Sequence, residues 1–289
     1  MIKPLRLRSF LLYGGIAAIL LVAVAGAYVF VFQANSRSDQ YSQRVRQSAI
    51  ALNSSFAKLA KTVQLDVFNN PDAAHKRADL DSVLSDISSV KTQLTDFKNS
   101  ANQRQPIPHI GLSASYRDAD ITQGHAADIT DQSADVIEQY QQLALFLKKF
   151  YAIDDNFIAI TGQLNGVSNL DSLAPDSGQV YSYGSQLAGL ADEIDKLKVP
   201  FGYSQLQTEA AAIYRKSSQG ANLLAYGLTT NNDTYKSSGI YMVEQATDEH
   251  DDKLANLPTD QAQTSYVLTQ VGDLPDKTDG IIAAADNGY

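Results

Sequence analysis

Apolar residues follow two patterns along this chain: one unbroken run, and several stretches in which they recur at steps of three and four. The run covers residues 10–32, FLLYGGIAAILLVAVAGAYVFVF, and contains no charged residue. As a helix it is roughly 35 Å long, enough to cross the ~30 Å hydrocarbon core of a bilayer. Because a single span in lipid must satisfy its own backbone hydrogen bonds, the run predicts one transmembrane helix.

The residues around this run predict its orientation. Lys3, Arg6 and Arg8 precede it, and no acidic residue lies among the first nine. Since positive charge favours retention in the cytoplasm, we expect residues 1–9 inside and the rest of the chain exported. Cleavage after Ala25-Gly26-Ala27 is the alternative, because these residues have the form of a signal-peptidase site. A signal core usually has only about 7–15 residues, and cleavage would leave an apolar terminus at Tyr28, so we favour a retained anchor.

Beyond the run, apolar residues share one face of each predicted helix. The run is predicted to continue without a break to Phe68, because no proline or glycine lies between Ala27 and Asn69. A second helix, after a break at 69–72, is predicted to end near Asn102. The predicted buried positions are Tyr41, Val45, Ala49, Leu52, Phe56, Leu59, Val63 and Val67 in the first helix, and Leu80, Val83, Ile87, Val90, Leu94 and Phe97 in the second.

A third, longer helix is predicted from residues 113–115 to Gly166, after a proline-containing loop at 105–111. Its predicted buried positions are Ile129, Val136, Tyr140, Leu143, Leu147, Phe150, Phe157 and Leu164. Three polar residues, Ser133, Asp154 and Thr161, fall on the same face. We therefore expect imperfect or partly open packing along this helix.

Four more helices are predicted after a boundary at 168–177. The first carries Tyr183, Leu187, Leu190, Ile194 and Leu197 and stops before Pro200; the next covers about 204–228 and carries Leu206, Ala210, Ile213, Ala221, Leu224 and Leu228. The last two end near Asn256 and Val271. No stretch alternates like a strand, so the fold class is all-α: a single N-terminal transmembrane helix continuing into an elongated antiparallel helical bundle of about six to seven soluble helices.

The predicted organisation has five parts. They are a short cytoplasmic N-terminus at 1–9, the transmembrane helix at 10–32, a long-helix bundle at 36–167, a second helical bundle segment at 176–272 and a loose C-terminal tail at 273–289. Without the three basic residues before the run, 20 Lys and Arg face 32 Asp and Glu, so the exported part carries a net charge of −12. Such a surface repels nucleic acid. The absence of cysteine excludes disulfides and thiolate metal sites.

Residue patterns for catalysis or cofactor binding are missing. None of the histidines belongs to a Glu-x-x-His or His-Glu-x-x-His motif, and no Gly-x-Ser-x-Gly or phosphate-binding glycine loop occurs. Only His250 shares the apolar phase of its helix, with Val243, Ala246 and Leu254, and we interpret it as a hydrogen-bonded core residue rather than an axial ligand. We predict no catalytic, cofactor-binding or metal-binding residue, and no enzyme activity.

Acidic residues form two stripes at helical spacing. Asp128, Asp131, Asp135 and Glu138 make the first, and Glu244, Asp248, Asp251 and Asp252 the second. Carboxylates in such a row can hold Ca²⁺ or face a basic partner. Because one helix face cannot surround an ion, we interpret both stripes as solvated helix surface.

These features favour a membrane-anchored, extracytoplasmic protein with a structural or interaction role, as a scaffold or surface-assembly component. Its expected partners are the membrane, crossed once, and another protein or a second copy of the chain. The alternative is a sensory or small-ligand-binding ectodomain, with Ser133, Asp154 and Thr161 lining a cleft, that signals through a partner protein.

Overall fold

The computed structural model describes residues 5–64, 73–103, 114–167, 176–200, 202–254 and 261–283. Within these ranges the chain is helical and contains no strand, so the predicted all-α class is confirmed. The predicted breaks at 69–72 and 105–111 and most of the boundary at 168–177 lie outside the described residues.

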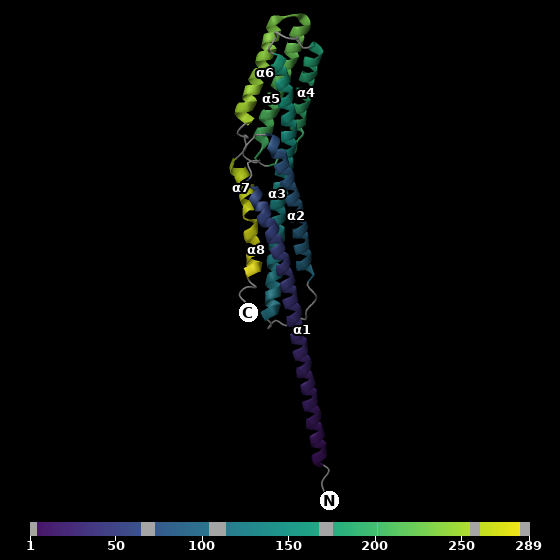
Figure 1. Cartoon of the computed structure of the whole chain (residues 1–289). Coiled ribbons are helices and arrows are strands. Elements are labelled where there is room, and N and C mark those ends of the chain that lie inside the picture. The colour runs from purple at the N-terminus through teal and green to yellow at the C-terminus, as the bar shows by residue number, and fades with distance from the viewer. Residues whose placement is uncertain are drawn as a thin grey trace. The chain divides into compact units, whose positions relative to one another are not determined.

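The helices follow the predicted order (Figure 1). Their bounds are α1 Leu5–Thr62, α2 Ala73–Asn102, α3 Ala114–Val167, α4 Ser177–Asp195, α5 Ser204–Thr230, α6 Asp233–Leu254, α7 Gln261–Gly272 and α8 Leu274–Ala283. Asp176 caps α4 by accepting a hydrogen bond from the backbone N–H of Gly178 at 3.0 Å. Between α5 and α6, Asn231 takes a left-handed conformation with φ 48°. The side chain of Asn232 then accepts from the N–H of Thr234 at 3.0 Å, which caps the start of α6.

The three-four spacing of apolar residues identifies the buried faces of the long helices. All six predicted positions of α2 are buried, as are those of α1 from Tyr41 to Leu59. In α3, seven of the eight predicted positions are buried, and so are the polar residues Ser133, Asp154 and Thr161. The exception is Val136: it is half-exposed, and Ile137 takes its place in the core.

The described chain divides into two compact units, each assembled from separate segments. Unit 1 comprises residues 1–53, 92–132 and 276–289, and unit 2 comprises residues 54–91 and 133–275. The long helices α1, α2 and α3 each contribute to both units. A compact unit of this chain is therefore built from several stretches of sequence.

In unit 1, polar contacts join α1 to α2 and to α8. The hydroxyl of Tyr41 donates to the carbonyl of Ala101 at 2.8 Å, and the Ser48 and Ser100 hydroxyls lie 2.8 Å apart. The amide of Asn53 donates to Thr278 of α8 at 2.6 Å. These contacts connect residues far apart in the sequence.

In unit 2, α2 and α3 run antiparallel and are joined by ion pairs. Lys91 contacts Glu138 at 2.8 Å, and earlier in α2 Asp81 pairs with Lys148, later in α3. The pair that lies earlier in α2 lies later in α3, so the two helices run antiparallel. Most of these charged groups are exposed, so each pair stabilises the contact by only ~1 kcal/mol or less.

Helices α4, α5 and α6 form two consecutive antiparallel hairpins in unit 2. Gln207, near the start of α5, donates to the carbonyl of Ile194 at the end of α4 (2.7 Å), while Ser218 donates to the carbonyl of Gly184 (2.7 Å). Glycines allow this close packing. A β-carbon on Gly220 of α5 would lie 2.8 Å from the carbonyl oxygen of Gly239 on α6.

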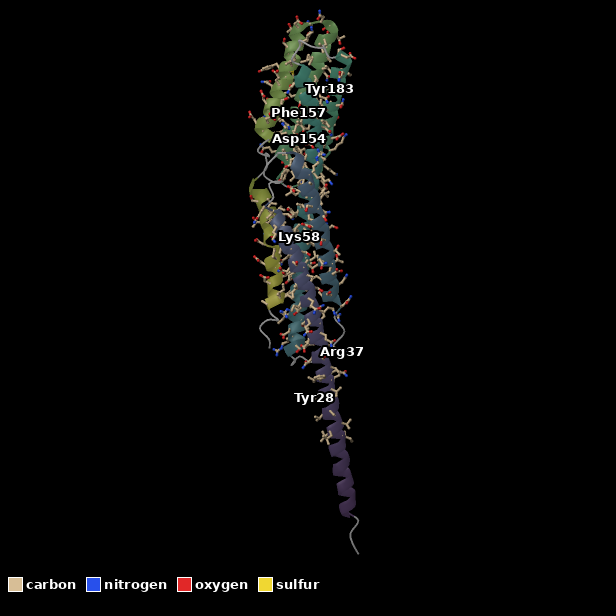
Figure 2. All side chains as sticks on the ribbon, viewed as in Figure 1. Tyr28, Arg37, Lys58, Asp154, Phe157 and Tyr183 are labelled. Carbon is tan, nitrogen blue, oxygen red and sulfur yellow. The ribbon has the colours of Figure 1, made fainter. Side chains whose placement is uncertain are left out.

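The apolar run leaves large side chains uncovered in α1. Residues from Ile19 to Phe32 are exposed, and Ile19, Leu21 and Tyr28 keep more than 70 % of their surface accessible. Figure 2 shows Tyr28 on this stretch of α1. After this exposed stretch, the first buried side chain is that of Ala34, and the later buried positions follow the three-four spacing. By length and composition, α1 is the one candidate membrane span within the described residues.

Two predicted boundaries are wrong. Helix α1 ends at Thr62 rather than Phe68. After it, the backbone N–H groups of Val63 and Gln64 donate hydrogen bonds to the carbonyls three residues earlier, those of Ala60 and Lys61, as in a 3₁₀ turn. The predicted loose tail contains α8, because Leu274, Thr278 and Ile281 share one buried face and Pro275 suits the first turn.

Candidate functional site

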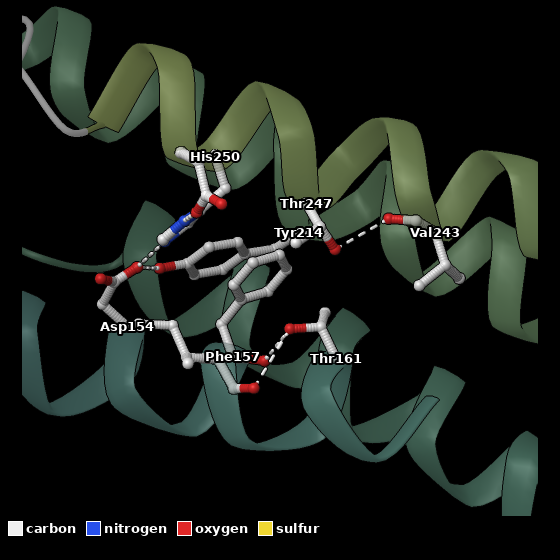
Figure 3. Close-up of polar contacts among 9 residues, drawn as sticks. Asp154, Phe157, Thr161, Tyr214, Val243, Thr247 and His250 are labelled. Carbon is white, nitrogen blue, oxygen red and sulfur yellow. Dashed lines mark hydrogen bonds and ion pairs between the residues drawn. The ribbon is translucent and has the colours of Figure 1, made fainter. Parts of the chain in front are cut away.

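A buried polar cluster joins three helices of unit 2. The carboxylate oxygen Oδ1 of Asp154, on α3, accepts a hydrogen bond from the hydroxyl of Tyr214 on α5 at 2.5 Å. The same oxygen lies 2.9 Å from Nε2 of His250 on α6 (Figure 3). We call Asp154, Tyr214 and His250 the buried triad. One carboxylate thus connects helices whose residues are up to 96 positions apart.

Helical spacing explains how each member reaches this point. Asp154 lies four residues after Phe150 and three before Phe157, both buried. Tyr214 follows Ala210 by four residues on the buried face of α5, and His250 follows Ala246 by four on α6. Each polar side chain is therefore carried into the core by the apolar residues of its own helix.

Aromatic rings pack against the triad. Phe157 stacks on Tyr214 with ring centroids 4.3 Å apart and an angle of 14° between the rings. Its centroid also lies 5.0 Å from that of His250. These contacts hold the tyrosine and histidine rings in position and exclude water from their faces, which strengthens the hydrogen bonds to Asp154.

Burial and charge act in opposite directions on His250. Burial disfavours its charged form, but the hydrogen bonds and negative charges of Asp154 and then Asp251 outweigh this, and the pKa of His250 is raised above 6.5. Asp251 lies 3.1 Å from Nδ1 and is exposed. Burial, and next the charge of Asp154, raise the pKa of Tyr214 well above 10.0, so its hydroxyl keeps its proton.

The geometry is that of a structural connection between helices. The side chains of Asp154 and His250 are only 6 % and 10 % exposed. Two grooves on the surface of unit 2, one beside Tyr203 and one beside Tyr181, are lined by residues other than the triad. The triad therefore satisfies buried polar groups and ties α3, α5 and α6 together, at the cost of desolvating a charged pair.

The polar residues predicted to line a cleft on α3 are all buried, but they do not meet at one site. Thr161 donates to the carbonyl of Phe157 in its own helix at 2.9 Å. The Ser133 hydroxyl is buried with no hydrogen-bond partner among the described residues. Only Asp154 reaches side chains of other helices. Sequence reasoning identified Asp154 and His250 separately and missed Tyr214, whose place four residues after Ala210 was the available signal.

The other predicted features stay apart from the triad. The residues of both acidic stripes are exposed, and Glu138 of the first stripe pairs with Lys91. His125 is exposed as well. No group of three or more potential metal ligands occurs in the part of the chain that the structure describes.

Comparison of the chain with protein-family models, with curated proteins and with solved structures finds no match. Its function is therefore inferred from its own residues.

Proposed function

We propose that the chain is a membrane-anchored, extracytoplasmic helical-bundle protein with a structural or interaction role. It crosses the cytoplasmic membrane once through residues 10–32, with residues 1–9 inside. The antiparallel helices beyond this span form a bundle that acts as a scaffold or surface-assembly component. The protein partner is another chain or a second copy.

One observation carries the proposal: a single helix changes from exposed apolar residues to a one-sided buried face. From Ile19 to Phe32, α1 exposes large apolar side chains of a kind that soluble proteins bury. From Ala34 onward the same helix packs through one face only. The first part suits hydrocarbon and the second suits water, and an uninterrupted helix links them.

Cysteine labelling tests the topology, because the chain has no native cysteine. Lys3→Cys and Tyr241→Cys place a thiol on either side of the apolar run, and Tyr241 is 60 % exposed. In intact cells, a membrane-impermeant maleimide should label Tyr241→Cys only, and lysis should add Lys3→Cys. Labelling of Lys3→Cys alone would reverse the proposed orientation. Labelling of both in intact cells, or of neither, would contradict a single span with an exported body.

The interaction role needs its own experiment. Chemical crosslinking of intact cells followed by purification of the full chain should recover a fixed stoichiometric partner or a homodimer. A chain that remains monomeric and alone in several growth conditions would argue against a scaffold.

The alternative, a ligand-binding ectodomain that signals through a partner, stays a proposal. The carboxylate of Asp154, on the face predicted to line a cleft, is occupied by Tyr214 and His250. A groove between α4 and α5 in unit 2 is the better location for a ligand.

A further inference from the structure

A groove lies between the start of α4 and the end of α5 in unit 2, distinct from the buried triad. Its volume is about 450 Å³. The side chains that define it are Ser177 and Tyr181 from α4, and Asn222, Tyr226 and Thr229 from α5. It is of a size that accommodates a small ligand.

Glycine allows α4 and α5 to approach closely beside these residues. Gly184 of α4 lies so close to α5 that a β-carbon there would stand 2.5 Å from the side-chain oxygen of Asn222. Gly178, at the first turn of α4, also borders the groove and contributes no side chain. The two helices are held together at Gly184, while the groove stays open toward the ends that carry Tyr181 and Tyr226.

Two tyrosine rings remain in solvent on the opposite sides of this groove. Tyr181 is 61 % exposed and Tyr226 is 54 % exposed. Tyr226 also packs edge-on against Tyr235 of α6, with centroids 5.1 Å apart, which restricts the position of its ring. Exposed tyrosines beside Asn and Ser are a composition that recognition surfaces favour, because tyrosine offers a large contact area at low entropic cost.

The lining selects against anionic ligands. None of the seven residues that line the groove carries a formal charge, and the carboxylate of Asp176, which caps α4, lies next to Gly178, so an anion would find no counter-charge and the hydroxyl groups of a ligand would find an acceptor. What the groove presents is aromatic surface together with amide and hydroxyl groups that donate and accept hydrogen bonds. A neutral pyranose matches both: its C–H face packs on an aromatic ring, and its hydroxyls point to the rim.

We propose that this groove binds a neutral saccharide, with sugar rings against Tyr181 and Tyr226 and hydroxyls bonded to Asn222 and neighbouring hydroxyl groups. The site goes beyond the proposed scaffold role, because it adds glycan binding to the helical body. It depends only on the folded helices α4 and α5, so it can be tested independently of the membrane topology.

Titration of the full chain with neutral oligosaccharides tests the site. The protein is kept in octaethylene glycol monododecyl ether, a detergent with neither sugar nor choline. The probes are chitotetraose in its N-acetylated form, cellotetraose and mannotetraose, followed by saturation-transfer NMR and calorimetry. At least one should bind with a Kd of about 1 mM or tighter. Tyr226→Ala and Tyr181→Ala should each weaken that binding about tenfold, a difference of ~1.4 kcal/mol.

Matched variants separate a ring contact from a general loss of structure. Tyr226→Phe keeps the ring and should stay within about threefold of the unchanged protein, a difference below ~1 kcal/mol. Tyr241→Ala removes a tyrosine that is 60 % exposed on α6, away from the groove, and should leave binding unchanged. Circular dichroism should give the same helix content for every variant.

Three results would overturn the assignment. One is the absence of binding by all three probes at about 10 mM, which is above the weakest affinity expected. Another is an equal effect of Tyr241→Ala and Tyr226→Ala. The third is loss of a co-purifying protein in the groove variants without saccharide binding, which would mean a protein occupant.

Discussion

Gly239 of α6 lies against Gly220 of α5 so closely that a β-carbon on Gly239 would stand 2.6 Å from the Gly220 carbonyl oxygen. The same β-carbon would stand 2.4 Å from the backbone nitrogen of Leu224. Both neighbours are backbone atoms, which cannot rotate away as a side chain can. The α5–α6 hairpin therefore depends on hydrogen atoms at these positions.

Gly239→Ala should lower the free energy of unfolding by about 1–3 kcal/mol, because α5 and α6 must separate to admit the methyl group. This loss should appear although alanine is favoured over glycine inside a helix by ~1 kcal/mol. Urea denaturation followed by circular dichroism measures it.

Gly189→Ala is the control for this change. Gly189 lies within α4 with no atom near the added β-carbon, so only the helix-propensity gain applies. Its stability should stay unchanged or rise by up to ~1 kcal/mol. Equal losses in Gly189→Ala and Gly239→Ala would contradict the close-packing argument.

Asp154→Ala should destabilise the protein by about 3–5 kcal/mol, because it leaves His250 and the Tyr214 hydroxyl buried without their shared acceptor. Asp135→Ala, an exposed position on the same helix, should change stability by less than ~0.5 kcal/mol. Chemical denaturation of both variants gives the comparison. Similar values for the two would show that the triad contributes little.

The pKa of His250 predicts how stability depends on pH. Because its folded pKa is raised above the unfolded value of 6.5, protonated His250 stabilises the fold. This stabilisation is fully present below pH 6.5 and is lost as pH rises through the raised pKa. The unfolding free energy of the unchanged chain should therefore fall across that window.

His250→Gln should lack this component of the pH dependence. Denaturation curves measured at several pH values for both proteins isolate it. The charged groups facing His250 are Asp154 from α3 and Asp251 from its own helix, and Tyr214 of α5 stays neutral there. Parallel pH profiles for the two proteins would remove His250 as the cause.

Charge in the apolar run should release the protein from membranes. Leu21→Arg combined with Val24→Arg places two charges where each costs about 2.5–3.5 kcal/mol at the centre of a span. Carbonate extraction of membranes should leave the unchanged chain in the pellet and move the double variant to the supernatant. Ile50→Arg, an exposed position later in the same helix, should remain in the pellet.

The three-four spacing of apolar residues predicted the buried face of α2 residue by residue. In a helix that packs along one side, this spacing alone determines which residues face the core. It missed the change from Val136 to Ile137 in α3. Both residues are β-branched and apolar, so only the neighbouring helices decide which one turns inward. The early end of α1 at Thr62 was missed because no proline or glycine marks it.

Contacts between helices lay beyond sequence reasoning. Asp154 and His250 were each placed on an apolar face, but their 2.9 Å contact depends on the register of α3 against α6. Glycines 184, 220 and 239 permit close approach between helices, and this role depends on which helices face one another. A single sequence gives the residues on each helix face but does not say which helix faces pack against each other.

The uninterrupted course of α1 has a mechanical consequence. Between Ala27 and Thr62 the helix contains no glycine or proline at which it could kink. In a thinner bilayer, a transmembrane helix longer than the hydrocarbon layer tilts so that its apolar ends stay within the lipid. If residues 10–32 cross a bilayer as proposed, such a tilt would be transmitted along α1 to Tyr41 and Ser48, and membrane thickness would set the tilt of this part of the helix.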